Sequence, residues 1–230
     1  RLLSRGLGDV YKRQIQMGAH RYDVTAFSAE LPSGLRIYLI HCPALFDRDG
    51  FYTSDWDEPL RFGVFCRAVI ECCQRMGWAP DVFHCNDWHT SLLPLYLRFH
   101  YGWDRLFASS RTLLAIHNIG YQGAFPADRL HDLDFGGFVE QLHNDDLRAG
   151  VLNFLKNGLI WADALSTVSR TYAREIQTAE FGVGLHEMLR QRDDHLIGIV
   201  NGVDYGDWDP STDPHPVSYT HLTLPTKVTV

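Results

Sequence analysis

Two groups of polar side chains in the sequence have the residue types that bind a polar substrate. The first group, at residues 84–89, follows a short apolar stretch and contains Asp87 and His89. The second group begins with the adjacent pair His117 and Asn118, directly after another apolar stretch. Side chains of these types hydrogen-bond well to the hydroxyls of a sugar. Asp87 and His89 would also meet a ligand at the start of a helix, where backbone N–H groups are free.

Two other kinds of chemistry are less well supported by the same residues. A metal ion needs several converging ligands, and the nearest set is His84, Asp87 and His89, with no second cluster at ligand spacing. A nucleophilic Cys85 needs a general base, but the neighbouring His84 would point to the opposite face of a strand. We therefore expect no bound metal and interpret Cys85 as a structural thiol. Asp87 could also simply cap the helix that follows it.

The polar groups follow apolar stretches that have the character of buried strands. Such stretches cover residues 82–85, 111–116, 164–168 and 196–200, and helical patterns lie between them. Strands that alternate with helices favour a parallel, Rossmann-like sheet with flanking helices. The carboxyl ends of parallel strands lie at one edge of the sheet, where open α/β sheets bind their ligands. We therefore expect all four turns after these strands to lie at that edge.

The remaining elements are predicted from periodicity and capping residues. Residues 21–31 and 35–42 predict a hairpin, and an apolar stripe over residues 59–76 predicts an amphipathic helix that Gly77 ends. Ser169 is predicted to cap a helix at its N-terminus. Other helices are predicted at residues 91–99, 151–162 and 184–192, and residues 127–150 are predicted to be irregular.

Composition excludes several classes of partner and compartment. The formal net charge is −7, with acidic and basic residues interspersed, so nucleic acid and anionic membranes are poor partners. Because no apolar run approaches the roughly 20 residues that span a bilayer, and no signal-peptide core is visible, we expect a cytoplasmic protein. The five cysteines form no CxxC pair and are interpreted as reduced, mostly buried thiols.

Both ends of the chain differ from the pattern between them. Residues 1–14 are basic and have no clear period, and residues 217–230 resemble the translated adapter sequence that contaminates some assembled reads. We interpret both ends as non-native tails. Residues 15–216 are then one partial domain.

Several stretches between these ends resemble the N-terminal catalytic domain of bacterial glycogen synthases and plant starch synthases, which form glycosyltransferase family five. Examples are DVFHCNDWH at residues 81–89 and IHNIGYQG at residues 116–123. Further matches lie at residues 37–48, 93–97, 153–163 and 168–210. The resemblance implies a Rossmann-like half of a two-domain GT-B enzyme, with the active site in the cleft between the two domains.

The resemblance also implies an activity and roles for particular residues. The activity is transfer of glucose from ADP-glucose to the non-reducing end of an α-1,4-glucan, with retention at the anomeric carbon and no cofactor. By motif position, His117 would lie at the donor glucose and the reacting centre, with Asn118 and Asp87 binding the sugar beside it. Tyr52 matches a donor-side tyrosine. The pocket wall would include His89, Tyr121 and Gln122.

The chain departs from the family pattern in two places. The family's Lys-Thr-Gly-Gly-Leu loop, which binds the donor diphosphate, and the strand before it are missing, and residues 6–10 imitate only the tail of that loop. The C-terminal nucleotide-binding domain is missing too. We therefore expect this polypeptide to be inactive alone, although the resemblance implies that its parent protein is a hexosyltransferase.

Two alternative functions remain open. The chain could be a non-catalytic glucan-binding module that kept only the acceptor side of the site. Less favoured is a metal-dependent hydrolase built on His84, Asp87 and His89.

Overall fold

The computed structural model describes residues 8–206 and 208. The chain divides into two units, Arg1–Ile199 and Val200–Val230, and each is described by itself. Of the predicted tails, residues 1–7 and 217–230 lie outside the described residues, so their origin stays a prediction.

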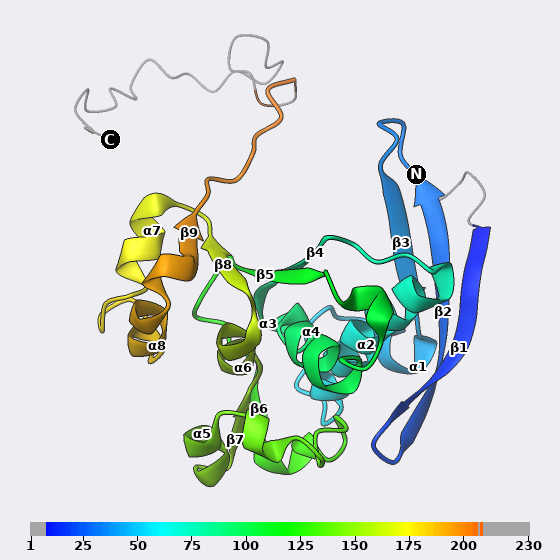
Figure 1. The fold of residues 1–230 in the computed structure, drawn as a ribbon, viewed down its shortest axis with the longest axis horizontal. Helices are drawn as coiled ribbons and strands as arrows, with labels where there is room; N and C mark the ends of the chain where they lie inside the picture. The colour runs from blue at the N-terminus through cyan, green and yellow to red at the C-terminus, as the bar shows by residue number, and fades with distance from the viewer. Residues whose placement is uncertain (1–7, 207, 209–230) are drawn as a thin grey trace. The chain divides into compact units, whose positions relative to one another are not determined.

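A four-stranded parallel sheet forms the centre of the first unit (Figure 1). Its strands lie in the order β4 (Val82–Asn86), β5 (Arg111–Ile116), β8 (Ala164–Thr167) and β9 (Leu196–Gly198). These are the four stretches predicted as buried strands, so the predicted Rossmann-like sheet is confirmed. The side chain of Leu114 in β5 is fully buried, as expected for a strand covered by helices.

The register of the sheet brings three strand ends level with one another. Asn86 of β4 pairs with Ala115 of β5, and Ile116 of β5 pairs with Thr167 of β8. The turns that follow these three strands therefore start at the same edge. The fourth predicted turn, at residues 201–204, belongs to the second unit, so its place at this edge stays a prediction.

A separate antiparallel sheet contains the predicted hairpin. Strands β2 (His20–Glu30) and β3 (Arg36–His41) pair as expected, and β1 (Gly8–Met17) adds a third strand beside β2. No element was predicted at residues 8–14, where the sequence has no clear period, yet they form most of this strand. These residues pair through their backbone with β2, which no side-chain period reveals.

The helix α2 (Glu58–Met76) lies between this antiparallel sheet and the short helices that follow β4 (Figure 1). Gly77 ends it, as predicted, with φ +61° and its N–H bonded to the carbonyls of Cys73 and Gln74. Glycine adopts this left-handed conformation at little cost. In the described part of the chain, no helix has the length and apolar character needed to cross a membrane.

The helix predicted at residues 91–99 is broken into short pieces. The structure has α3 (Asp87–Thr90), α4 (Leu93–Leu95) and a π-helical turn, η2 (Tyr96–His100). Pro94 has no N–H to bond to the carbonyl four residues earlier, so a continuous α-helix is disfavoured here.

The helix predicted at residues 151–162 starts later than expected. Residues Val151–Asn153 form a short strand, β7, which pairs with β6 (Ala124–Pro126) before α6 (Phe154–Trp161) begins. Asn153 caps α6, since its side-chain oxygen accepts the N–H of Lys156 at 2.9 Å. The remaining helices and turns are α1 (Pro43–Phe46), η3 (Arg105–Phe107), η4 (Ala127–Leu130), η5 (Val139–Gln141), α5 (Asn144–Arg148), α7 (Arg170–Glu175), α8 (His186–Gln191) and η6 (Asp193–His195).

The predicted cap of α7 is confirmed. The hydroxyl of Ser169 accepts the backbone N–H of Tyr172 at 2.9 Å.

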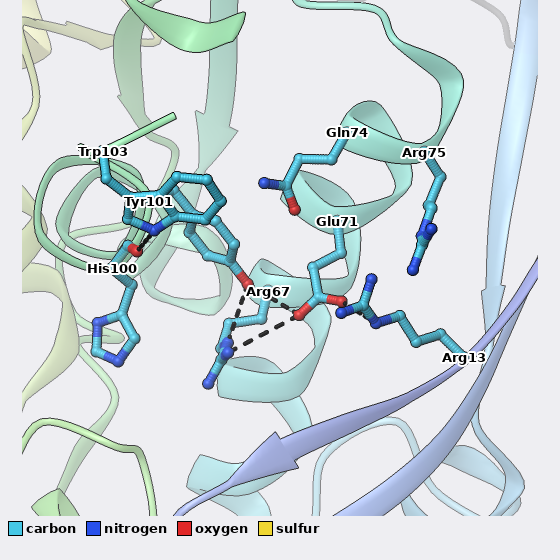
Figure 2. A pocket seen from close by; sticks show the side chains of 8 residues that line it. All are labelled: Arg13, Arg67, Glu71, Gln74, Arg75, His100, Tyr101 and Trp103. Carbon is cyan, nitrogen blue, oxygen red and sulfur yellow. Dashed lines mark hydrogen bonds and ion pairs between the residues drawn. The ribbon is translucent and has the colours of Figure 1, made fainter. Parts of the chain in front are cut away.

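A polar cavity of about 460 Å³ is lined by residues of β1, of α2 and of the turn at residues 100–103 (Figure 2). The nearly buried carboxylate of Glu71 accepts a hydrogen bond from Tyr101 at 2.9 Å and pairs with Arg13 at 3.0 Å. Arg67 donates to the same Tyr101 hydroxyl at 3.2 Å. These charges satisfy one another and join neighbouring elements, so we interpret the cavity as a structural junction.

Candidate active site at the ends of the parallel strands

The ends of β4 and β5 are joined by two hydrogen bonds to one histidine. The carboxylate Oδ1 of Asp87 accepts the backbone N–H of His117 at 2.8 Å. The side-chain Oδ1 of Asn86 lies 2.9 Å from the imidazole Nε2 of the same histidine. Since Asn86 pairs with Ala115, the residues just beyond both strands are brought together. The two predicted polar groups therefore form one site.

Asp87 has a different structural role from the capping role considered above. The N-cap of α3 is Asn86, and neither it nor Asp87 makes a side-chain cap bond, so the capping interpretation is wrong. Asp87 instead has φ +55°, in the left-handed region that Asp tolerates better than most residues. Such backbone strain is found where the surrounding structure fixes a functional side chain.

A cavity of about 350 Å³ opens beside this junction. Asp87 and Asn118 contribute polar side chains to its lining, which also includes Tyr52 and Tyr121, 71% and 69% exposed. Its volume falls in the range of small-molecule sites. The full lining consists of Tyr52, Asp87, Trp88, His89, Asn118 and Tyr121. Five of the seven predicted site residues therefore line one cavity.

The two other predicted residues lie next to this cavity. His117 is exposed and is bonded to Asp87, one of the lining residues. Gln122 lines an adjoining cavity of about 260 Å³ that shares Tyr52, Trp88 and Tyr121 with the first.

The side chain of Gln122 is held in place at both ends. Its Nε2 donates to the carbonyl of Val183 at 2.9 Å, and its Oε1 accepts from Asn153 at 2.7 Å. Next to it, Gly123 has φ +61°, and a Cβ there would overlap the ring of Trp88. This turn therefore needs glycine and keeps the wall of the site rigid.

Trp88 and Asn86 are site residues that sequence reasoning missed. Trp88 is buried and lines both cavities, and its ring centroid lies 4.0 Å from that of His89. The position of Trp88 between the predicted site residues Asp87 and His89 could have indicated from the sequence that it belongs to the site. Asn86 and His117 are 31 residues apart in the sequence, although their side chains form a hydrogen bond. Only the register of the two strands could have indicated this contact.

His89 forms part of the wall in a largely apolar environment. Its ring lies 4.7 Å from Phe62 and 5.4 Å from Tyr52, measured between centroids. Burial lowers the pKa of His89, which favours the neutral imidazole. Its buried Nε2 has no hydrogen-bond partner among the described residues, which is uncommon for a buried polar atom.

The loop that carries Tyr52 is held by a buried ion pair. Arg61 donates to Glu58 at 2.6 Å and to the carbonyl of Phe51 at 3.1 Å, and both charged side chains are buried. The hydroxyl of Thr53 donates to the same Glu58 carboxylate at 2.8 Å. The residues on both sides of Tyr52 are therefore fixed to α2.

Replacing Arg61 by alanine should lower the free energy of unfolding by about 3 kcal/mol, because the buried charge of Glu58 would lose its partner. Urea denaturation followed by circular dichroism measures this. The matched control is Arg148→Ala, which breaks the exposed pair with Asp145 and should cost about 0.5 kcal/mol or less. Equal losses in the two variants would contradict the structural role given to Arg61.

The structure gives little support to nucleophilic or metal chemistry at this site. Burial raises the pKa of Cys85 to about 12, which keeps it a thiol, and all five cysteines are buried and free. Across residues 8–206 and 208, no three His, Cys, Asp or Glu side chains gather as a possible metal-ligand set. The hydrolase built on His84, Asp87 and His89 therefore lacks a set of converging ligands.

Comparison with solved structures shows that the chain has the Rossmann-like fold of part of a GT-B glycosyltransferase. The catalytic domain of starch synthase IV from Arabidopsis thaliana, bound to ADP and acarbose, superimposes with a TM-score of 0.79. The sequences are 31% identical, and the match covers 91% of this chain and 43% of that one.

The chain belongs to the starch synthase catalytic domain family, whose profile matches residues 4–191. It is 49% identical over 179 residues to the glycogen synthase of Desulforudis audaxviator, covering 77% of this chain and 35% of that protein. The glycogen synthase of Thermodesulfovibrio yellowstonii is 45% identical over 183 residues, with 77% and 36% covered. The chain thus spans little more than a third of the length of these relatives.

Proposed function

We propose that the longer protein to which this chain corresponds transfers glucose from ADP-glucose to the non-reducing end of an α-1,4-glucan, with retention. The bond between the Asp87 carboxylate and the His117 backbone carries the proposal, because it unites both polar groups at one edge of the sheet. The names of the relatives, and the ADP and acarbose bound to starch synthase IV, support the choice of donor and acceptor.

Each predicted site residue has a role in this proposal. His117 lies at the reacting centre, Asp87 fixes its backbone, and Asn118 hydrogen-bonds to the donor sugar. Tyr52, on the loop that is fixed to α2, lies on the donor side of the site. The wall of the pocket is completed by His89, Tyr121 and Gln122.

The proposed mechanism is front-face displacement. The site contains a carboxylate, amides and neutral rings, whereas the nearby thiol of Cys85 is buried and protonated. The leaving diphosphate then accepts the proton of the acceptor hydroxyl as the new glycosidic bond forms on the same face. The protein contributes by holding donor and acceptor in line and by stabilising charge with fixed dipoles.

The proposal includes a second, nucleotide-binding domain that completes the cleft. The chain alone is then inactive, its residues 15–216 form the partial catalytic domain, and the whole enzyme works in the cytoplasm. No metal or other cofactor takes part.

A chimera tests this function. Residues 15–206 would replace the matching segment of the Desulforudis audaxviator glycogen synthase, which supplies the remaining length. We expect the chimera, but not the 230-residue chain alone, to incorporate labelled glucose from ADP-glucose into glycogen. A chimera that folds and binds glycogen without transfer would instead support the glucan-binding module.

A further inference from the structure

The side-chain amide of Asn86 contacts two groups that together define its orientation. Its Nδ2 lies 3.3 Å from the backbone carbonyl of His84, and its Oδ1 lies 2.9 Å from Nε2 of His117. A carbonyl oxygen can only accept, so the NH₂ end of the amide must face His84. The amide oxygen, which also can only accept, then faces the imidazole. The hydrogen of this bond therefore resides on Nε2 of His117.

The backbone of Asn86 is itself held in place. Its N–H donates to the hydroxyl of Thr90 at 2.6 Å, and that hydroxyl donates to the Asn86 carbonyl at 2.9 Å. The next residue, Asp87, holds the backbone N–H of His117 at 2.8 Å. Two successive residues at the end of β4 thus fix both the main chain and the ring of one histidine.

We propose that Asn86 is a positioning residue that keeps His117 in the tautomer protonated on Nε2. A neutral imidazole has one donor and one acceptor nitrogen, so Nδ1 is left as the acceptor. The role of this tautomer in the chemistry rests on the proposed function. In that function, Nδ1 of His117 accepts a hydrogen bond from a sugar hydroxyl. A ring with the other tautomer would donate from Nδ1 instead, and would suit a diphosphate oxygen.

The proposal differs from a purely structural role for Asn86 in what it predicts for the ring. A residue that only shapes the strand end could be replaced without altering the protonation of His117. A positioning residue cannot, because its oxygen selects which nitrogen carries the hydrogen. The preference of His117 for protonation on Nε2 should persist in Asn86→Asp, which keeps an acceptor oxygen, and should be lost in Asn86→Ala.

Nitrogen NMR of the full chain, labelled with ¹⁵N histidine, tests the proposal at mildly alkaline pH, where imidazoles are neutral. The signals of His117 are assigned by their loss in His117→Gln. We expect one protonated Nε2 and one unprotonated Nδ1, with widely separated shifts. In Asn86→Ala the two shifts should move toward the average of exchanging tautomers, and in Asn86→Asp they should stay apart.

The neighbouring asparagine provides the matched control. The side-chain oxygen of Asn118 accepts the N–H of Gly120 at 2.9 Å, so Asn118→Ala should leave the ring signals of His117 unchanged. Protonation on Nδ1 in the unaltered chain would overturn the proposal whether or not the variants fold. An unchanged pattern in Asn86→Ala would overturn it too. The measurement needs no glucose transfer, so failure of the proposed function would be recognised separately.

Discussion

Replacing His117 by alanine should lower glucose transfer by the chimera about a thousandfold, the scale expected when a fixed polar group at a reacting centre is removed. The backbone N–H of residue 117 would still bond to Asp87, so the strand ends should stay joined. The loss would then come from the imidazole alone. Initial rates of labelled glucose incorporation into glycogen measure the effect, with circular dichroism to confirm the fold.

His195→Ala is the matched control for this variant. His195 is exposed on the turn η6, where it pairs with Asp194 at 3.6 Å, and it belongs to neither cavity of the site. Its replacement should leave the rate unchanged. Transfer by His117→Ala within tenfold of the unaltered chimera would remove His117 from the reacting centre.

Replacing Asp87 by glycine should lower transfer about a hundredfold, because misplacement of a reacting group by a small distance has effects of this size. Glycine accepts the left-handed backbone at φ +55°, so the main chain can keep its path. The carboxylate that holds the His117 backbone is lost. We expect a fall in kcat together with little change in stability, measured by steady-state kinetics and urea denaturation.

Asp87→Asn separates the hydrogen bond from the charge. Asparagine tolerates the left-handed backbone and offers an amide oxygen to the same N–H, so this variant should retain more activity than Asp87→Gly. Equal activity of Asp87→Gly and the unaltered chimera would show that the bond to His117 does not matter for transfer.

The parallel sheet and the meeting of the two polar groups could be predicted from the sequence. Each strand of this sheet is a short apolar run followed directly by polar residues, and parallel strands deliver such residues to one edge. The approach of Asp87 to His117 follows from that rule alone. Their direct hydrogen bond could not be predicted, because it depends on the register of β4 against β5.

Other features depended on contacts that a linear pattern does not contain. Strand β1 forms because its backbone pairs with β2, although its outward residues are polar. The helix after β4 is interrupted at residues 91–92, just before Pro94, which lies in the first turn of α4. The apolar run around Pro94 hid this interruption in the sequence. The anchoring of Tyr52 needs Arg61 and Glu58, charged residues that a helical stripe would place in solvent.

Strand β4 lies at the border of the parallel sheet, and among the described residues it pairs with β5 alone. Val82 on this strand is 51% exposed. An unpaired row of backbone N–H and C=O groups beside such a side chain is a template for another chain. Copies of this polypeptide should therefore associate with one another through this edge as the protein concentration rises.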